Sequence, residues 1–86
     1  MELQNAFRNA VEAAEKLPRR PSNEDLLKMY GLYKQATEGD ISGDRPGGFD
    51  FKAIAKFDAW AEQKGKSKEE AMQTYINFIE KLQNEL

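Results

Sequence analysis

Residues 30–60 read YGLYKQATEGDISGDRPGGFDFKAIAKFDAW, with helical patterns on both sides of a glycine-rich segment. The first part of this stretch places Tyr30, Tyr33 and Lys34 at positions i, i+3 and i+4, so the three side chains share one face of a helix. Residues 39–49 hold four glycines, one proline and two aspartates, a composition typical of a loop. Asp50 is a favourable N-cap for the helical segment that follows. The stretch therefore predicts two helices joined by a long loop.

Helical patterns continue on both sides of this stretch. We expect the helix that carries Tyr30 to span residues 23–38 and to end at Gly39, because glycine adopts the left-handed C′ conformation without steric cost. The next helix is expected over residues 51–64, ended by Gly65. After it, Ser67-Lys68-Glu69-Glu70 forms a capping box that opens a last helix.

Apolar residues recur at helical spacing in the first and last helices. Gly31 is a flaw inside the second, since a glycine there costs about 1 kcal/mol relative to alanine. No alternation typical of β-strands is present, so we predict an all-α fold of four helices. The N-terminal stripe consists of Leu3, Ala6, Phe7, Ala10, Val11, Ala14 and Leu17, and the C-terminal one of Ala71, Met72, Tyr75, Ile79, Leu82 and Leu86.

The composition limits the classes of function. With 86 residues, 40% of them apolar and 33% charged, the chain is expected to be one soluble domain over residues 1–86. No apolar run approaches the roughly 20 residues of a transmembrane helix, and the N-terminus lacks the features of a signal peptide. Cysteine and histidine are absent, which fits a cytoplasmic protein and removes thiolate metal sites and the usual neutral-pH acid or base. The net charge of −2 argues against a nucleic-acid partner.

Several side chains suit a ligand with a phosphorylated head and an apolar tail. Lys52 and Lys56 form an i, i+4 pair on the third helix, and lysine ammonium groups donate charge-assisted hydrogen bonds to phosphates. Aromatic rings such as those of the tyrosines stack on nucleobases. Leu26 and Leu27 lie one turn before Tyr30 and extend its face with apolar surface.

Other interpretations of the same residues stay open. Tyrosines at helical spacing are often core residues and helix lysines are usually solvated, so the pattern alone predicts only a small helical bundle. An enzyme is disfavoured, because catalysis would rest on carboxylates, lysines, tyrosines or hydroxyls. Asp40, Asp44 and Asp50 lack the ordered spacing of an EF-hand loop. We therefore expect no catalytic residue, no metal ligand and no cofactor.

The elements YGLYKQAT, GD, RPG, DF, AK, DAW, KG, S-x-E-E-A-M and YI resemble those of the acyl-CoA-binding protein family. The similarity covers nearly all of the chain and is strongest over residues 30–76. It implies an up-down-down-up four-helix bundle that binds and carries medium- to long-chain fatty acyl-CoA esters, one per chain, without catalysis. It also implies transient contacts with enzymes that use acyl-CoA. A monomer is expected, because the bundle can bury its own apolar stripes.

The resemblance assigns roles to individual residues. Tyr33 would stack on the adenine, Lys34 and Lys56 would hold the ribose 3′-phosphate together with the Tyr30 hydroxyl, and Tyr75 would close the site. The acyl chain would run between the first two helices, lined by Phe7, Leu26 and Leu27. The implied head-group contacts are Tyr30, Tyr33, Lys34, Lys52, Lys56 and Tyr75.

The chain also departs from the family pattern. Ala53, Ile54 and Phe57 stand where glycine, lysine and tryptophan are usual, and Glu15 stands where the family often has a lysine near the ligand's phosphates. A carboxylate there would repel the phosphates, so affinity is affected more than ligand class. The alternative function is a helical protein-interaction module that has lost acyl-CoA binding.

Overall fold

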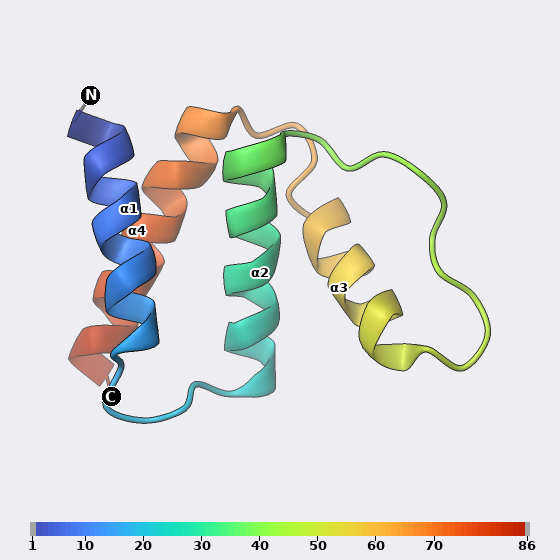
Figure 1. The fold of residues 1–86 in the computed structure, drawn as a ribbon, viewed down its shortest axis with the longest axis horizontal. Coiled ribbons are helices and arrows are strands. Elements are labelled where there is room, and N and C mark those ends of the chain that lie inside the picture. Colours follow the sequence, from blue (N-terminus) through green and yellow to red (C-terminus); the bar gives the residue numbers. More distant parts are fainter. Residues whose placement is uncertain (1, 86) are drawn as a thin grey trace.

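The computed structural model describes residues 2–85, which form four α-helices and no strand: α1 (Glu2–Glu15), α2 (Asn23–Glu38), α3 (Phe51–Ala61) and α4 (Lys68–Glu85). The chain descends along α1, ascends along α2 and then α3, and descends again along α4 (Figure 1). The predicted all-α fold with up-down-down-up topology is confirmed. Of the predicted apolar positions, Leu86 lies outside the described residues.

The helix ends follow the capping signals of the sequence. The Ser22 Oγ accepts a hydrogen bond from the Asp25 N–H at 3.1 Å, and the Asp50 Oδ1 accepts one from the Ala53 N–H at 3.1 Å. The predicted capping box forms in both directions. The Ser67 Oγ accepts from the Glu70 N–H at 3.0 Å, and the Glu70 carboxylate accepts from the Ser67 N–H at 3.1 Å.

Helix α3 is shorter than predicted. It ends at Ala61 rather than at residue 64, and residues 62–65 form a turn. The N–H groups of Gln63 and Lys64 bond to the carbonyls three residues earlier, those of Trp60 and Ala61. This tighter pattern ends the α-helical ladder before the glycine is reached. Gly65, with φ of 99°, then turns the chain toward α4.

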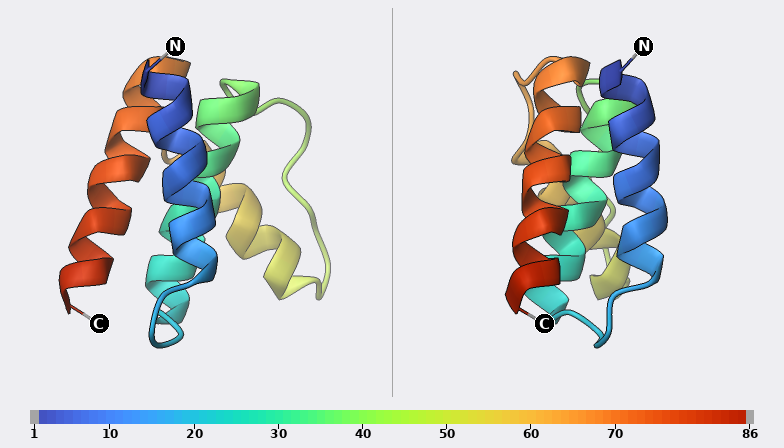
Figure 2. Two further views of the ribbon diagram at one scale, coloured as in Figure 1. Left: turned by 60° about the vertical axis from the view of Figure 1, so that its left-hand side comes forward. Right: turned by 90° about the vertical axis from the view of Figure 1, so that its left-hand side faces the viewer.

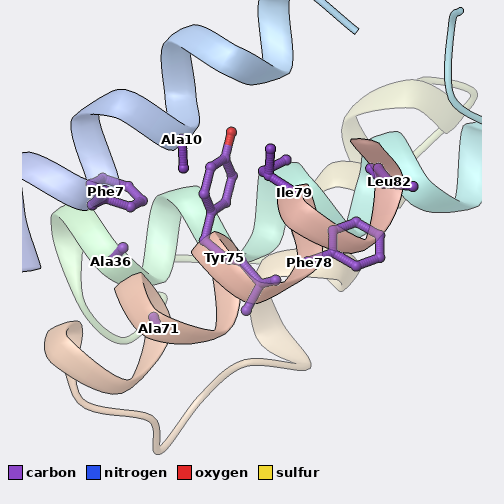
Figure 3. Packing of buried hydrophobic residues seen from close by; sticks show 9 residues of the cluster. Phe7, Ala10, Ala36, Ala71, Tyr75, Phe78, Ile79 and Leu82 are labelled. Atoms are coloured by element: carbon purple, nitrogen blue, oxygen red, sulfur yellow. The ribbon is translucent and has the colours of Figure 1, made fainter. Parts of the chain in front are cut away.

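The helices pack in the spatial order α1, α4, α2, α3. Helix α4 contacts both α1 and α2, whereas α3 contacts α2 as its one helical neighbour among the described residues (Figure 2). The core therefore lies between α1, α2 and α4, with Tyr75 pointing from α4 toward α1 (Figure 3). Its buried residues are Phe7, Ala10, Leu32, Ala36, Ala71, Tyr75, Phe78, Ile79 and Leu82. The α2–α3 interface is separate from this core.

At Gly31 the backbones of α2 and α3 approach each other closely. A Cβ built on Gly31 would lie 2.3 Å from the carbonyl oxygen of Ala59 and 2.7 Å from its carbonyl carbon. Real Cβ atoms are not found at such distances, so only glycine allows this approach. The residue that looked like a flaw in the sequence is thus required by the packing of α3 on α2.

The loop between α2 and α3 is tied to α3 at its start and at its middle. The Arg45 guanidinium donates two hydrogen bonds of 2.8 Å to the Asp58 carboxylate. The Trp60 Nε1–H donates to the Gly39 carbonyl at 2.9 Å. These contacts help to hold α3 beside α2, the one helix that it contacts within residues 2–85.

Asp40 fastens the start of the loop to the turn after α3. Its Oδ1 accepts hydrogen bonds from the Gly65 N–H at 2.9 Å and from the Nε2 of the fully buried Gln35 at 2.8 Å. The Gly65 and Gln35 hydrogen bonds, with the nearby charge of Lys64, hold the pKa of Asp40 below its ordinary value of 3.8.

We expect Asp40→Asn to weaken the dependence of stability on acid. Because the folded-state pKa of Asp40 is lowered, the ionised carboxylate stabilises the fold above pH 3.8, and this contribution is lost as the pH falls through the lowered pKa. The asparagine variant has no such titration. Its free energy of unfolding, measured by urea denaturation across pH, should fall less steeply than that of the wild type below about pH 4.

Asp44→Asn is the matched control for this prediction. Asp44 belongs to the same loop, and within residues 2–85 its carboxylate accepts no hydrogen bond. This variant should keep the wild-type slope. Equal slopes for Asp40→Asn and the wild type would contradict the assigned role.

No helix of the described part of the chain is long and apolar enough to cross a membrane.

Candidate functional site

A groove between α2 and α3 gathers most of the predicted binding residues. It has a volume of about 550 Å³ and is open to solvent along one side. Five predicted residues line it: Leu26, Leu27, Tyr30, Lys52 and Lys56. The remaining lining residues are Arg20, Asn23 and Ala55. We call this hollow the α2–α3 groove.

Lysines and aromatic rings pair across the two parallel helices. The Lys56 Nζ lies 5.2 Å from the centroid of the Tyr30 ring, and one turn further along the Lys34 Nζ lies 5.0 Å from the centroid of the Trp60 ring. Ammonium groups at these distances are attracted to the face of the ring. Lys34 and Trp60 thus extend the surface beside the groove toward the C-terminal end of α2.

Lys34 is engaged by a neighbour on its own helix. Its Nζ donates to the Glu38 carboxylate, one turn further along α2. This hydrogen bond raises the pKa of Lys34, and the partial desolvation of the ammonium group opposes the rise. A phosphate that binds Lys34 must therefore compete with Glu38.

Three further predicted residues form an aromatic cluster where α2 meets α1 and α4. The ring of Phe7 lies 6.0 Å from that of Tyr33 and 5.2 Å from that of Tyr75, and the two tyrosine rings are 6.5 Å apart. Tyr33 is 41% exposed, whereas Tyr75 is buried. Phe7 and Tyr33 also line a smaller hollow of about 300 Å³ that shares no residue with the α2–α3 groove. The structure therefore places Phe7 with the tyrosines and apart from Leu26 and Leu27.

The hydroxyl of Tyr75 is a hydrogen-bond donor at every physiological pH. Burial, followed by the proximity of Tyr33 and of the Glu15 carboxylate, raises the pKa of Tyr75 to about 12. The ring points toward α1, with its hydroxyl beside Ala10 (Figure 3). The negative charge of Glu15 thus acts on the pKa of the Tyr75 hydroxyl in the same direction as burial.

Three further residues at or near the groove were not predicted as site residues. Helical spacing could have indicated two of them, but not the third. Asn23 precedes Tyr30 by seven residues, which places it on the same face of α2. Trp60 likewise continues the i, i+4 row of Lys52 and Lys56. Arg20, whose guanidinium donates to the Asn23 Oδ1 at 3.2 Å, lies in the linker before α2, where no periodicity indicates which way a side chain points.

A second hollow on the opposite side of the α2–α3 contact has the wrong charge for a phosphate. It encloses about 560 Å³ and shares Leu27 and Ala55 with the groove. Its lining includes the carboxylates of Glu24, Asp58 and Glu62, against the one ammonium of Lys28. Within residues 2–85 there is also no cluster of carboxylates able to hold a metal ion. The α2–α3 groove, with three cations, is therefore the candidate site.

Comparisons with known proteins agree with one another. The family model described as Acyl CoA binding protein matches residues 4–79. The acyl-CoA-binding domain-containing protein 3 of Oryza sativa subsp. japonica is 52% identical over 99% of this chain, which spans 55% of that protein's length. An acyl-CoA-binding protein of Brassica napus is 50% identical, with 95% of this chain and 89% of the relative covered.

Solved structures show the same relationship in three dimensions. The crystal structure of Oryza sativa acyl-CoA-binding protein 2 matches with a TM-score of 0.92 at 51% identity, covering 96% of this chain and 92% of that one. The crystal structure of the protein from Moniliophthora perniciosa matches with a TM-score of 0.87 at 37% identity, covering 95% and 81%. The chain belongs to the acyl-CoA-binding protein family.

Proposed function

We propose that the protein binds medium- to long-chain fatty acyl-CoA esters, one per chain, and carries them without catalysis as a cytoplasmic monomer. The observation that carries this proposal is the α2–α3 groove, where apolar side chains and three cations line one hollow. The family relationship supports it, since the relatives at about 50% identity are named for acyl-CoA binding. In this proposal residues 1–86 act as a single acyl-CoA-binding domain.

The groove suits a ligand that is apolar at one end and anionic at the other. Leu26, Leu27 and Ala55 offer apolar surface to the acyl chain, and each buried methylene contributes up to about 0.8 kcal/mol. Lys52 and Lys56 offer ammonium donors to phosphates, in charge-assisted bonds that are stronger than neutral ones. The two together would select an acyl-CoA over a free fatty acid or free coenzyme A.

The aromatic cluster extends the proposed site around α2. Tyr33 is exposed enough to offer one face to an adenine ring, a stacking contact that contributes about 1 to 3 kcal/mol. Tyr75 supplies a hydroxyl donor, and Phe7 supports both rings. Lys34 lies one position after Tyr33 on α2, and it holds the 3′-phosphate in this proposal together with Lys56 and the Tyr30 hydroxyl.

Calorimetric titration with palmitoyl-CoA tests the proposed function, with free palmitate and free coenzyme A as controls. We expect one-to-one binding that is much tighter than that of either control. Folded protein that does not bind palmitoyl-CoA would contradict the proposal and would favour a module that binds a partner helix through the same apolar surface.

We expect Lys34→Ala to weaken palmitoyl-CoA binding by about 1.5 to 3 kcal/mol, the range for hydrogen bonds to charged groups. Because Lys34 must leave Glu38 to bind the phosphate, this loss is the net binding free energy that the exchange of partners contributes. Calorimetry measures it directly. Lys81→Ala is a matched control, because Lys81 also pairs with a glutamate four residues later, Glu85 at 3.9 Å, but lies on α4 outside the proposed site. Unchanged affinity in Lys34→Ala would remove Lys34 from the site.

A further inference from the structure

Phe49 and Phe51 form an exposed aromatic pair that neither the core nor the groove explains. Phe49 is 91% exposed and Phe51 is 69% exposed, and their rings meet edge to face with centroids 6.2 Å apart. They lie where the long loop enters α3 and line neither of the hollows beside that helix. A single exposed apolar residue is ordinary, but two contacting rings held in water indicate a surface that is covered in use.

Two cations that line the groove lie at the same end of the bundle as this pair. Lys52 directly follows Phe51, and Arg20 lines the same groove from the linker before α2. The linker and the first turn of α3 lie at the same end of the bundle (Figure 1). Within residues 2–85, neither Arg20 nor Lys52 forms a salt bridge. Asp50, which stands between the two phenylalanines in the sequence, accepts a hydrogen bond from the Ala53 N–H and caps α3.

The chemistry of this end favours a lipid surface over a second copy of the chain. A phenylalanine buries about 150 to 250 Å², so the pair offers about 300 to 500 Å², less than the roughly 800 Å² that each partner contributes to a stable interface. A bilayer needs no such area. Aromatic rings enter the boundary between headgroups and acyl chains, and lysine or arginine side chains next to them bind anionic headgroups.

We propose that Phe49 and Phe51, together with Arg20 and Lys52, dock the protein reversibly onto anionic bilayers. The rings enter the interfacial layer and the two cations contact the headgroups. The net charge of −2 opposes adsorption of the molecule as a whole, so docking depends on the local cations and rings of this end. Where the proposed acyl-CoA carriage holds, docking also brings the Arg20–Lys52 end of the groove to the layer into which an acyl-CoA partitions.

Sedimentation with vesicles tests the docking in protein without ligand. The vesicles consist of phosphatidylcholine alone or with about 30% phosphatidylserine, since anionic lipid attracts the cations. We expect binding to the anionic vesicles that falls with salt, and little binding to phosphatidylcholine alone. Phe49→Ser/Phe51→Ser and Arg20→Gln/Lys52→Gln should each weaken the partition coefficient by about tenfold or more. Lys64→Gln/Lys81→Gln, which removes two cations elsewhere, is the matched control. Its partition coefficient should fall less than that of Arg20→Gln/Lys52→Gln.

The outcomes separate docking from acyl-CoA binding. Calorimetry without vesicles should show Phe49→Ser/Phe51→Ser binding palmitoyl-CoA like the wild type, with an unchanged circular dichroism spectrum. Wild-type protein that docks but does not bind palmitoyl-CoA would overturn the proposed carriage and leave the docking intact. Absence of wild-type binding to anionic vesicles, or equal binding by the serine variant, would overturn the docking. A dimer in light scattering that the serine variant abolishes would assign the aromatic pair to a second copy and overturn it as well.

Discussion

Gly31→Ala is expected to lower the free energy of unfolding by about 3 kcal/mol, at the upper end of the usual range for overpacking. The added methyl carbon would lie 2.3 Å from the Ala59 carbonyl oxygen. Both contacting groups are fixed to helix backbones, so no flexible side chain can move aside, and α3 must shift as a whole. Helix propensity alone predicts the opposite sign, a gain of about 1 kcal/mol. Urea denaturation followed by circular dichroism therefore decides between the two effects.

Gly47→Ala is the control that isolates the close approach. Gly47 lies in the long loop, and a Cβ added to it would meet no atom within 4 Å. Its φ is not in the left-handed region, so alanine should be neutral or stabilising by up to about 1 kcal/mol through the unfolded state. If Gly31→Ala proved as stable as Gly47→Ala, α3 could not pack on α2 through the close contact at Ala59.

Shortening the acyl chain of the ligand from palmitoyl to octanoyl is expected to weaken binding by up to about 6 kcal/mol, because eight methylenes at about 0.8 kcal/mol each leave the groove. The loss per methylene should be constant for the part of the chain that Leu26, Leu27 and Ala55 cover. Beyond that part, further lengthening should add little. Calorimetric titration of a series of saturated acyl-CoA esters gives both the slope and the length at which it ends.

Repeating the series with Lys34→Ala tests whether the head and the tail of the ligand act independently. Interactions at separated sites with no shared partner usually add, so the variant should shift the whole series by one constant amount. An affinity that does not change with chain length would contradict the assignment of the groove to the acyl chain. A shift that grows with chain length would show that Lys34 contacts the tail.

Much of the fold could be predicted from the sequence, because it is encoded by local signals. The bounds of α2 match those expected, since Ser22 caps its start and Gly39, with φ of 82°, ends it. The capping box at Ser67 is equally local and forms as expected. The family resemblance also proved correct, and with it the order in which the helices run up and down.

The features that were missed depend on contacts between elements distant in the sequence. The role of Gly31 exists only because the Ala59 carbonyl faces it from α3. The early end of α3 results from hydrogen bonds in a turn that helical periodicity does not describe. Helical spacing places Tyr30, Tyr33 and Lys34 on one face of α2. In the structure, Tyr30 lines the groove beside α3, whereas Tyr33 packs near Phe7 of α1 and Tyr75 of α4. The predicted site is therefore divided between a groove and an aromatic cluster. The roles given to its residues stay predictions.

The close contact between Gly31 and Ala59 provides a line about which α3 could tilt against α2. Leu27 and Ala55 line the hollows on both sides of this contact, and one turn later Gly31 and Ala59 continue the same line. A rocking motion of α3 about this line would widen the cationic groove only by narrowing the acidic hollow behind it. A ligand that widens one hollow would therefore narrow the other, with no unfolding of the core.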